Sequence, residues 1–153
     1  MSRRTIFLTL LVASSIAYGA EQLAPKIEPL EEKLVSVLFE RIDKKEKIEF
    51  ELLCQALIGP QTTLRAYAAT LLGDSGDKRA IPFLIDALSD DSAHVGANYI
   101  DPGDATTRHR ANKGLKKLTK REFRFVWNDP KKKRNEAILK WIEYYKKEVV
   151  PRA

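Results

Sequence analysis

Residues 64–91 constrain the fold of this 153-residue chain more than any other stretch. They read LRAYAATLLGDSGDKRAIPFLIDALSDD, with apolar side chains at helical spacing on both sides of a Gly/Asp turn. Gly73 and Gly76 permit a tight turn there, and Asp77 is placed to cap the helix that follows. Small residues stand where two helices would have to touch. The stretch therefore predicts two packed helices joined by a short turn.

Nearly every other segment has the same helical period, which predicts an all-α chain of about six helices. The predicted helices cover residues 29–42, 48–57, 64–72, 81–88, 106–119 and 130–149. Thr62 or Thr63 is expected to cap the third of them. Between the last two helices, Phe123, Phe125 and Trp127 occur at every second position. That spacing predicts a short extended segment whose aromatic side chains cover the end of the core.

Part of the pattern occurs twice, with an Arg, a small residue and a Leu at spacing i, i+3, i+7. The two sets are Arg65, Ala68 and Leu72, then Arg108, Ala111 and Leu115. Between them, the helix after the Gly/Asp turn begins with Ile81 and Pro82. These motifs resemble the HEAT-like repeats of the PBS-lyase type, and the resemblance extends over residues 48–149. A generic helical bundle is the alternative that the same periodicity allows.

The resemblance implies a short α-solenoid of antiparallel helix pairs, with about two repeats and a helix covering each end. It also implies that the repeat Arg can bridge to a loop carboxylate. Repeats of this type present a surface to another protein. The resemblance to bilin lyases alone does not imply an activity, because a fold does not carry a function by itself.

The N-terminus has the three parts of a secretory signal peptide. Arg3 and Arg4 form a basic start, residues 5–17 are uncharged and apolar or small, and small residues follow at 17–20. Cleavage after Gly19 suits these small residues best. The apolar run is short for a membrane span, which needs about 20 residues. An uncleaved anchor and a buried N-terminal helix are the alternatives.

The predicted organisation is a signal peptide at residues 1–20, an extended lead-in at 21–28 and one helical domain at 29–149. A polar loop at 89–106 interrupts that domain. We expect the protein to be exported to the periplasm or secreted, with no stable membrane span once the signal is removed.

The charge balance argues against a nucleic-acid binder. The chain has 27 Lys and Arg against 21 Asp and Glu. Loss of the signal removes two arginines, so the net charge of the remainder is only +4. Cys54 is the sole cysteine, so no intramolecular disulfide can form. It lies on an apolar helical face and is expected to be a small buried side chain rather than a nucleophile.

The loop at 89–106 and its flank hold the residues most suited to a metal: Asp90, Asp91, His94, Asp101, Asp104 and His109. Carboxylates with histidine suit transition metals. However, their spacing matches no known calcium loop or zinc motif, and Asp101-Pro102-Gly103-Asp104 is ordinary turn chemistry. We therefore expect no metal, no cofactor and no catalytic residues.

A second candidate site is cationic. It comprises Lys116, Lys117, Lys120, Arg121, Arg124, Lys131, Lys132, Lys133 and Arg134. Such a patch can bind phosphate, uronate or carboxylate groups, with Phe125, Trp127 and Tyr144 available to stack on a glycan. The plainer interpretation is a solvated basic face with core aromatics.

The sequence thus predicts an exported, non-catalytic adaptor that binds another protein. A binder of an anionic envelope polymer or glycan is the first alternative, and a lyase-like or metal-dependent enzyme is the second.

Overall fold

The computed structural model describes residues 21–93 and 99–152. Within them the chain forms six α-helices, and the only pairing of extended backbone is an isolated bridge between Ala93 and Thr106. The helices are α2 (Glu32–Asp43), α3 (Phe50–Leu57), α4 (Thr62–Asp74), α5 (Ile81–Ala87), α6 (Thr107–Thr119) and α7 (Lys131–Tyr144). The predicted all-α class is confirmed. The signal predicted at residues 1–20 lies outside the described residues.

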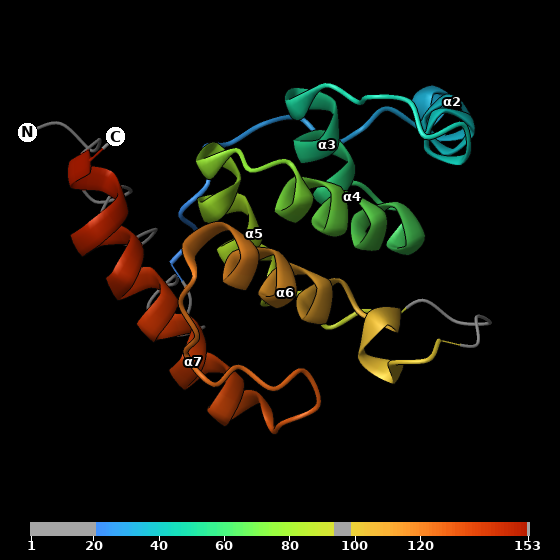
Figure 1. The fold of residues 1–153 in the computed structure, drawn as a ribbon. Helices are drawn as coiled ribbons and strands as arrows, with labels where there is room; N and C mark the ends of the chain where they lie inside the picture. Colours follow the sequence, from blue (N-terminus) through green and yellow to red (C-terminus); the bar gives the residue numbers. More distant parts are fainter. Residues whose placement is uncertain (1–20, 94–98, 153) are drawn as a thin grey trace, which may run out of the picture.

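The helices stack as two antiparallel pairs, α3 with α4 and α5 with α6, in a short solenoid (Figure 1). α4 and α6 lie side by side and share the most extensive contact between any two helices of the described chain. α2 lies at one end of the stack and α7 crosses the other end (Figure 1). No helix in the described ranges combines the length and apolar character that crossing a membrane requires.

Several helix ends differ from the sequence prediction, three of them for a visible reason. α2 begins at Glu32 instead of residue 29, because Leu30 first donates its backbone N–H to the carbonyl of Gln55 at 3.0 Å. Gln61 precedes α4 without a side-chain cap, so the predicted threonine cap is wrong. α7 ends at Tyr144 and continues as a π-helical turn, η3 (Tyr145–Val149), and a 3₁₀ turn, η4 (Val150–Arg152).

Side-chain caps hold the two short turns that lead into α5 and α6. Asp77 accepts a hydrogen bond from the backbone N–H of Arg79 at 2.9 Å and caps η1 (Lys78–Ala80), as expected from the sequence. Asp101 does the same for Gly103 in η2 (Pro102–Ala105), at 3.0 Å. Thr106 then caps α6. The described part of the loop is therefore fastened directly to the helix that follows it.

The segment between α6 and α7 brings its aromatic side chains onto the core, as the alternating pattern predicted. Phe125 is buried. The ring of Phe123 meets the edge of Trp141 with centroids 4.6 Å apart, and it also contacts Tyr144. Trp127 packs edge-on against His109, with centroids 6.3 Å apart. These aromatics connect α7 to the repeat stack. Of the three residues considered for stacking on a glycan, Phe125 is part of the core, and Trp127 and Tyr144 are partly buried against it.

The close approach of α4 and α6 depends on two glycines. A Cβ atom added to Gly73 would overlap the Cα atom of Gly114, and one added to Gly114 would lie 2.9 Å from the Cα of Gly73. The backbones therefore touch directly at this point. Ala69 and Ala111, from the same two helices, are fully buried and extend the seam of small residues.

We predict that Gly73→Ala destabilises the protein by about 2 kcal/mol, because the backbone of Gly114 cannot move aside and overpacking typically costs 1–3 kcal/mol. Alanine is a better helix former than glycine by about 1 kcal/mol, so without the contact the substitution would stabilise α4. The sign of the change in the free energy of urea unfolding shows whether the steric overlap or the higher helix propensity of alanine dominates. An increase in stability would contradict the backbone contact.

Candidate functional site

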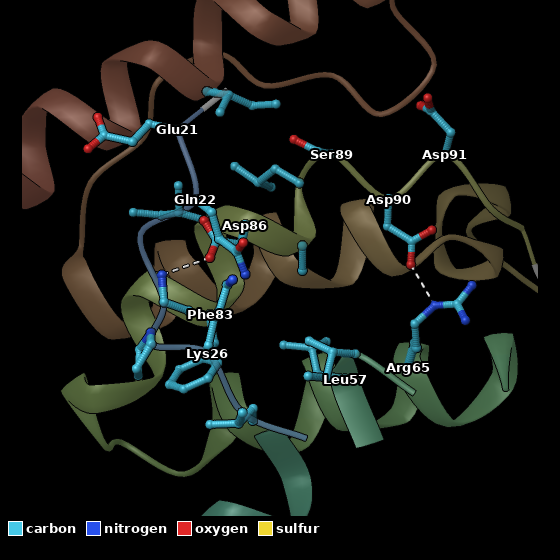
Figure 2. A pocket seen from close by; sticks show the side chains of 18 of the residues that line it. Glu21, Gln22, Lys26, Leu57, Arg65, Phe83, Asp86, Ser89, Asp90 and Asp91 are labelled. Atoms are coloured by element: carbon cyan, nitrogen blue, oxygen red, sulfur yellow. Dashed lines mark hydrogen bonds and ion pairs between the residues drawn. The ribbon is translucent and has the colours of Figure 1, made fainter. Parts of the chain in front are cut away.

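A hollow of about 910 Å³ lies between residues 21–28, α5 and the first half of α7 (Figure 2). Its size falls within the range of ligand sites in proteins, roughly 300–1,000 Å³. Charged side chains of both signs line it, including Lys26, Asp86 and Arg134. Its apolar surface comes from Leu57, Phe83, Ile85, Leu88 and Ile138.

A second hollow, of about 1,090 Å³, lies on the other side of residues 21–28. Pro25 and Ile27 of that segment and Phe83 of α5 line both hollows. The segment therefore crosses one broad depression and divides it in two. The remaining apolar lining of the second hollow comes from Phe50, Cys54, Ile81, Pro82, Leu118, Tyr144, Tyr145, Val149 and Val150.

Asp86, near the end of α5, fastens the segment through its main chain. One carboxylate oxygen accepts the backbone N–H of Leu23 and the other accepts that of Ala24, each at 2.8 Å. Figure 2 shows Asp86 bonded to the backbone of this segment. Burial raises the pKa of the Asp86 carboxyl, and the two N–H donors oppose that shift. A carboxylate on the apolar side of α5 is thus satisfied by the backbone of the segment that covers it.

The segment itself lies shallowly. None of the side chains of residues 21–28 is buried, and only those of Leu23, Ala24 and Ile27 are partly buried against the core. At its start, Glu21 forms an exposed ion pair with Lys146. We call residues 21–28 the strap, and the depression beneath it, between α5, α7 and η3, the strap groove.

Asp90 and Asp91, which follow α5, bind arginines from three helices. Arg65 of α4 donates from Nε to the Asp90 carboxylate at 2.8 Å, and both side chains are less than one-fifth exposed. Arg108 of α6 donates to the backbone carbonyl of Asp90 at 3.2 Å. Arg134 of α7 pairs with the carboxylate of Asp91. The expected bridge from a repeat Arg to a loop carboxylate is confirmed at Arg65, and Arg108 also reaches Asp91 at 3.4 Å.

The Asp90 carboxylate is stabilised in its charged form. Burial alone would raise its pKa, but hydrogen bonds from the side chain and backbone of Ser92 and from Arg65 outweigh burial and leave the pKa below its ordinary value. This carboxylate is therefore a structural anchor, charged at neutral pH and already fully bonded.

The loop brings together three of the residues considered for a metal. The Nε2 atom of His109 lies 2.9 Å from an oxygen of Asp101 and 4.0 Å from one of Asp104. However, the ammonium group of Lys113 already contacts the same two carboxylates, at 3.2 and 2.7 Å. The hydrogen bond from His109, with those from Gly103 and Lys113, lowers the pKa of Asp101 to about 2. The cluster is thus a set of ion pairs that hold η2 and the preceding Asp101 against α6.

The other metal candidates are not part of this cluster. Asp90 and Asp91 are occupied by the arginines, and His94 lies outside the described residues. Cys54 is buried as expected, and burial raises the pKa of its thiol to about 12, so it remains protonated at neutral pH.

Six of the nine cations predicted as one patch line three different hollows. Lys116, Lys117 and Lys120 line a third one, of about 540 Å³, on α6 beside Thr70. Arg121 lines the second hollow, whereas Lys131 and Arg134 line the first.

Many of these cations already have acidic partners. Lys116 pairs with Glu122, Lys117 with Asp74 and Arg121 with Glu148. Within the described ranges no ion pair forms at Lys120, Arg124, Lys132 or Lys133, which are all exposed. The cations without an ion pair in the described chain therefore lie partly in the segment after α6 (Lys120, Arg124) and partly in α7 (Lys132, Lys133).

Sequence reasoning missed Asp86, the residue that organises the strap. Its signal was present: a single charged residue stands within the apolar run from Ile81 to Leu88. A buried carboxylate needs donors, but nothing in the sequence indicated that the backbone of residues 23 and 24 would supply them.

The family model described as PBS lyase HEAT-like repeat matches residues 64–90, which span α4 and α5. No curated protein and no solved structure matches the chain. The match confirms the resemblance stated from the sequence, and the chain therefore carries a HEAT-like repeat. Repeats of this type generally mediate protein interactions through the extended surfaces of their stacked helices.

We predict that Asp90→Asn lowers the free energy of unfolding at pH 7 by about 1–3 kcal/mol, as expected for loss of a charged hydrogen-bond partner. Because folding lowers the pKa of Asp90, its contribution is complete above the ordinary aspartate value of about 3.9 and disappears as the pH falls through the folded-state pKa. Urea unfolding of the two proteins at pH 7 measures the loss of stability, and the same measurement at pH 2.5 shows how much of that loss remains in acid. Asp43→Asn, at an exposed position, is the control, and an equal effect of the two substitutions at pH 7 would contradict the anchor role.

Proposed function

We propose that this HEAT-like repeat protein is an exported, non-catalytic adaptor that binds another protein. One observation carries the proposal. The helix α5, inside the matched repeat, forms the floor of both large hollows, through Phe83 in each. Apolar depressions of this size on a repeat stack are typical binding surfaces.

The absence of catalytic function is part of the proposal and rests on the chemistry of the candidate groups. The thiol of Cys54 is protonated and buried. Asp101 and Asp104 are both ion-paired with Lys113, and Asp90 is ion-paired with Arg65. Each of these groups thus already has a structural role in the fold.

Binding to a protein is tested by a pull-down from envelope extract at low and at high salt, read by mass spectrometry. We expect one defined protein to be retained at both salt concentrations, because burial of apolar surface is insensitive to ionic screening. The complex should then re-form from the two purified proteins with a single Kd.

The control bait carries Lys132→Gln and Lys133→Gln, which removes two exposed cations that have no structural partner in the described chain. It should retain the same protein. Loss of all retained material at high salt and with this bait would instead indicate an anionic polymer as the partner.

Export rests on the basic start, apolar run and small residues of positions 1–20. We expect the protein to accumulate outside the cytoplasm with its N-terminus at Ala20 or Glu21. Intact mass spectrometry of fractionated cells measures this. A full-length chain that stays with the membrane fraction would show that the segment is kept as an anchor.

A further inference from the structure

The strap shows what kind of ligand the groove beneath it holds. Residues 21–28 cross the strap groove without regular secondary structure, with a bend at Ala24, and join the rest of the chain through residues 29–31, ahead of α2. Figure 2 shows Asp86 hydrogen-bonded to the backbone of the strap. The groove therefore binds a short non-helical segment of the same molecule.

Asp86 recognises main chain, not side chains. Its two oxygens accept consecutive N–H groups, those of Leu23 and Ala24, at equal distances of 2.8 Å. In extended backbone, consecutive N–H groups point to opposite sides, and the chain bends at Ala24 so that both can reach Asp86. A segment that bends in the same way can supply the same bonds. Hydrogen bonds to a charged acceptor contribute about 1.5–3 kcal/mol each, so this pair is a strong backbone anchor.

The side chains of the strap add little to its retention. Leu23 and Ile27 pack partly against the core, while every other side chain except that of Ala24 is exposed. Beneath them lie Phe83 and Ile85 of α5 and Ile138 of α7, all buried apolar residues. The hollows on both sides of the strap leave room for side chains larger than its own.

We propose that the strap groove is the docking site of the adaptor, and that its occupant is a non-helical segment of the partner protein that bends as the strap does and displaces residues 21–28. The segment presents two adjacent backbone N–H groups to Asp86 and aliphatic side chains in place of Leu23 and Ile27. This inference rests on the proposed adaptor function and assigns it a surface.

Charge does not select the occupant. The first hollow carries Lys26, Arg65, Lys131 and Arg134 together with Glu21, Glu28, Asp86, Asp90 and Asp91. Arg65 and Arg134 are already paired with the two aspartates that follow α5. Hydrogen bonds to the backbone and apolar contacts therefore determine what binds in the groove. This preference favours a peptide over an anionic polymer as the occupant.

The test uses a fluorescent peptide with the sequence of residues 21–30, EQLAPKIEPL, and the protein purified from the compartment in which it accumulates. The variant Ala24→Pro removes one N–H donor from the strap without altering the groove. We expect the peptide to bind this variant about ten-fold more tightly than the unmodified protein. The reason is that apparent affinity falls in proportion to the fraction of molecules with an open groove.

Two matched controls accompany it. Lys26→Pro places a proline in the same strap at a nitrogen that donates no hydrogen bond within the described chain, and it should bind the peptide like the unmodified protein. A peptide methylated on the nitrogens of its Leu and its Ala loses both donors and should bind the Ala24→Pro variant at least ten-fold more weakly. Equal binding of the two peptides, or no binding by the folded variant, would overturn the proposal.

Hydrogen exchange on the unmodified protein gives an independent readout that needs no variant. Saturating peptide should accelerate exchange of the amide protons of Leu23 and Ala24, because the strap leaves Asp86 when the peptide arrives. Unchanged exchange at saturation would place the peptide elsewhere and also overturn the proposal.

The two proposals fail separately. A defined partner in the pull-down without peptide binding would leave the adaptor function intact and move its interface to another face. Peptide binding without a retained partner would leave the groove assigned and remove the adaptor function.

Discussion

The direct backbone contact between Gly73 and Gly114 determines how the rest of the molecule is arranged. With no side chain between them, α4 and α6 approach closely enough for their buried faces to share one core. The same approach places Arg65 and Arg108, near the start of each helix, on either side of the link that follows α5. A wider separation would leave at least one of these arginines without its partner.

The Asp90–Asp91 link then connects this helix pair to α7. Arg134 reaches Asp91, and Arg108 bonds to the backbone of the same link. The Asp91 side chain is 53% exposed, so solvent screening leaves its ion pairs with little net free energy. Their effect here is to fix the position of α7 relative to the link. That placement forms one wall of the strap groove.

Much of this arrangement was predictable from local pattern. The helix pair at 64–91, the turn capped by Asp77 and the reach of Arg65 to a loop carboxylate all depend on residues close in sequence or on the repeat itself. The grouping of Asp101, Asp104 and His109 depends on the register of η2 against α6, and the arginine-to-Asp91 contact joins positions 43 residues apart. Periodicity within one segment carries no information about such pairings. The position of the strap was unpredictable for the same reason, since Asp86 and Leu23 are 63 residues apart.

The attachment of the strap to its own groove has a quantitative consequence. A segment joined to the domain by a few residues competes at an effective concentration on the order of millimolar, whatever the amount of protein in the cell. A partner present at about micromolar concentration must therefore bind the groove roughly a thousand-fold more tightly than the strap does before it occupies half of the molecules. Under the docking proposal, the short tether therefore sets an affinity threshold that only a partner with substantially better contacts than the strap can exceed.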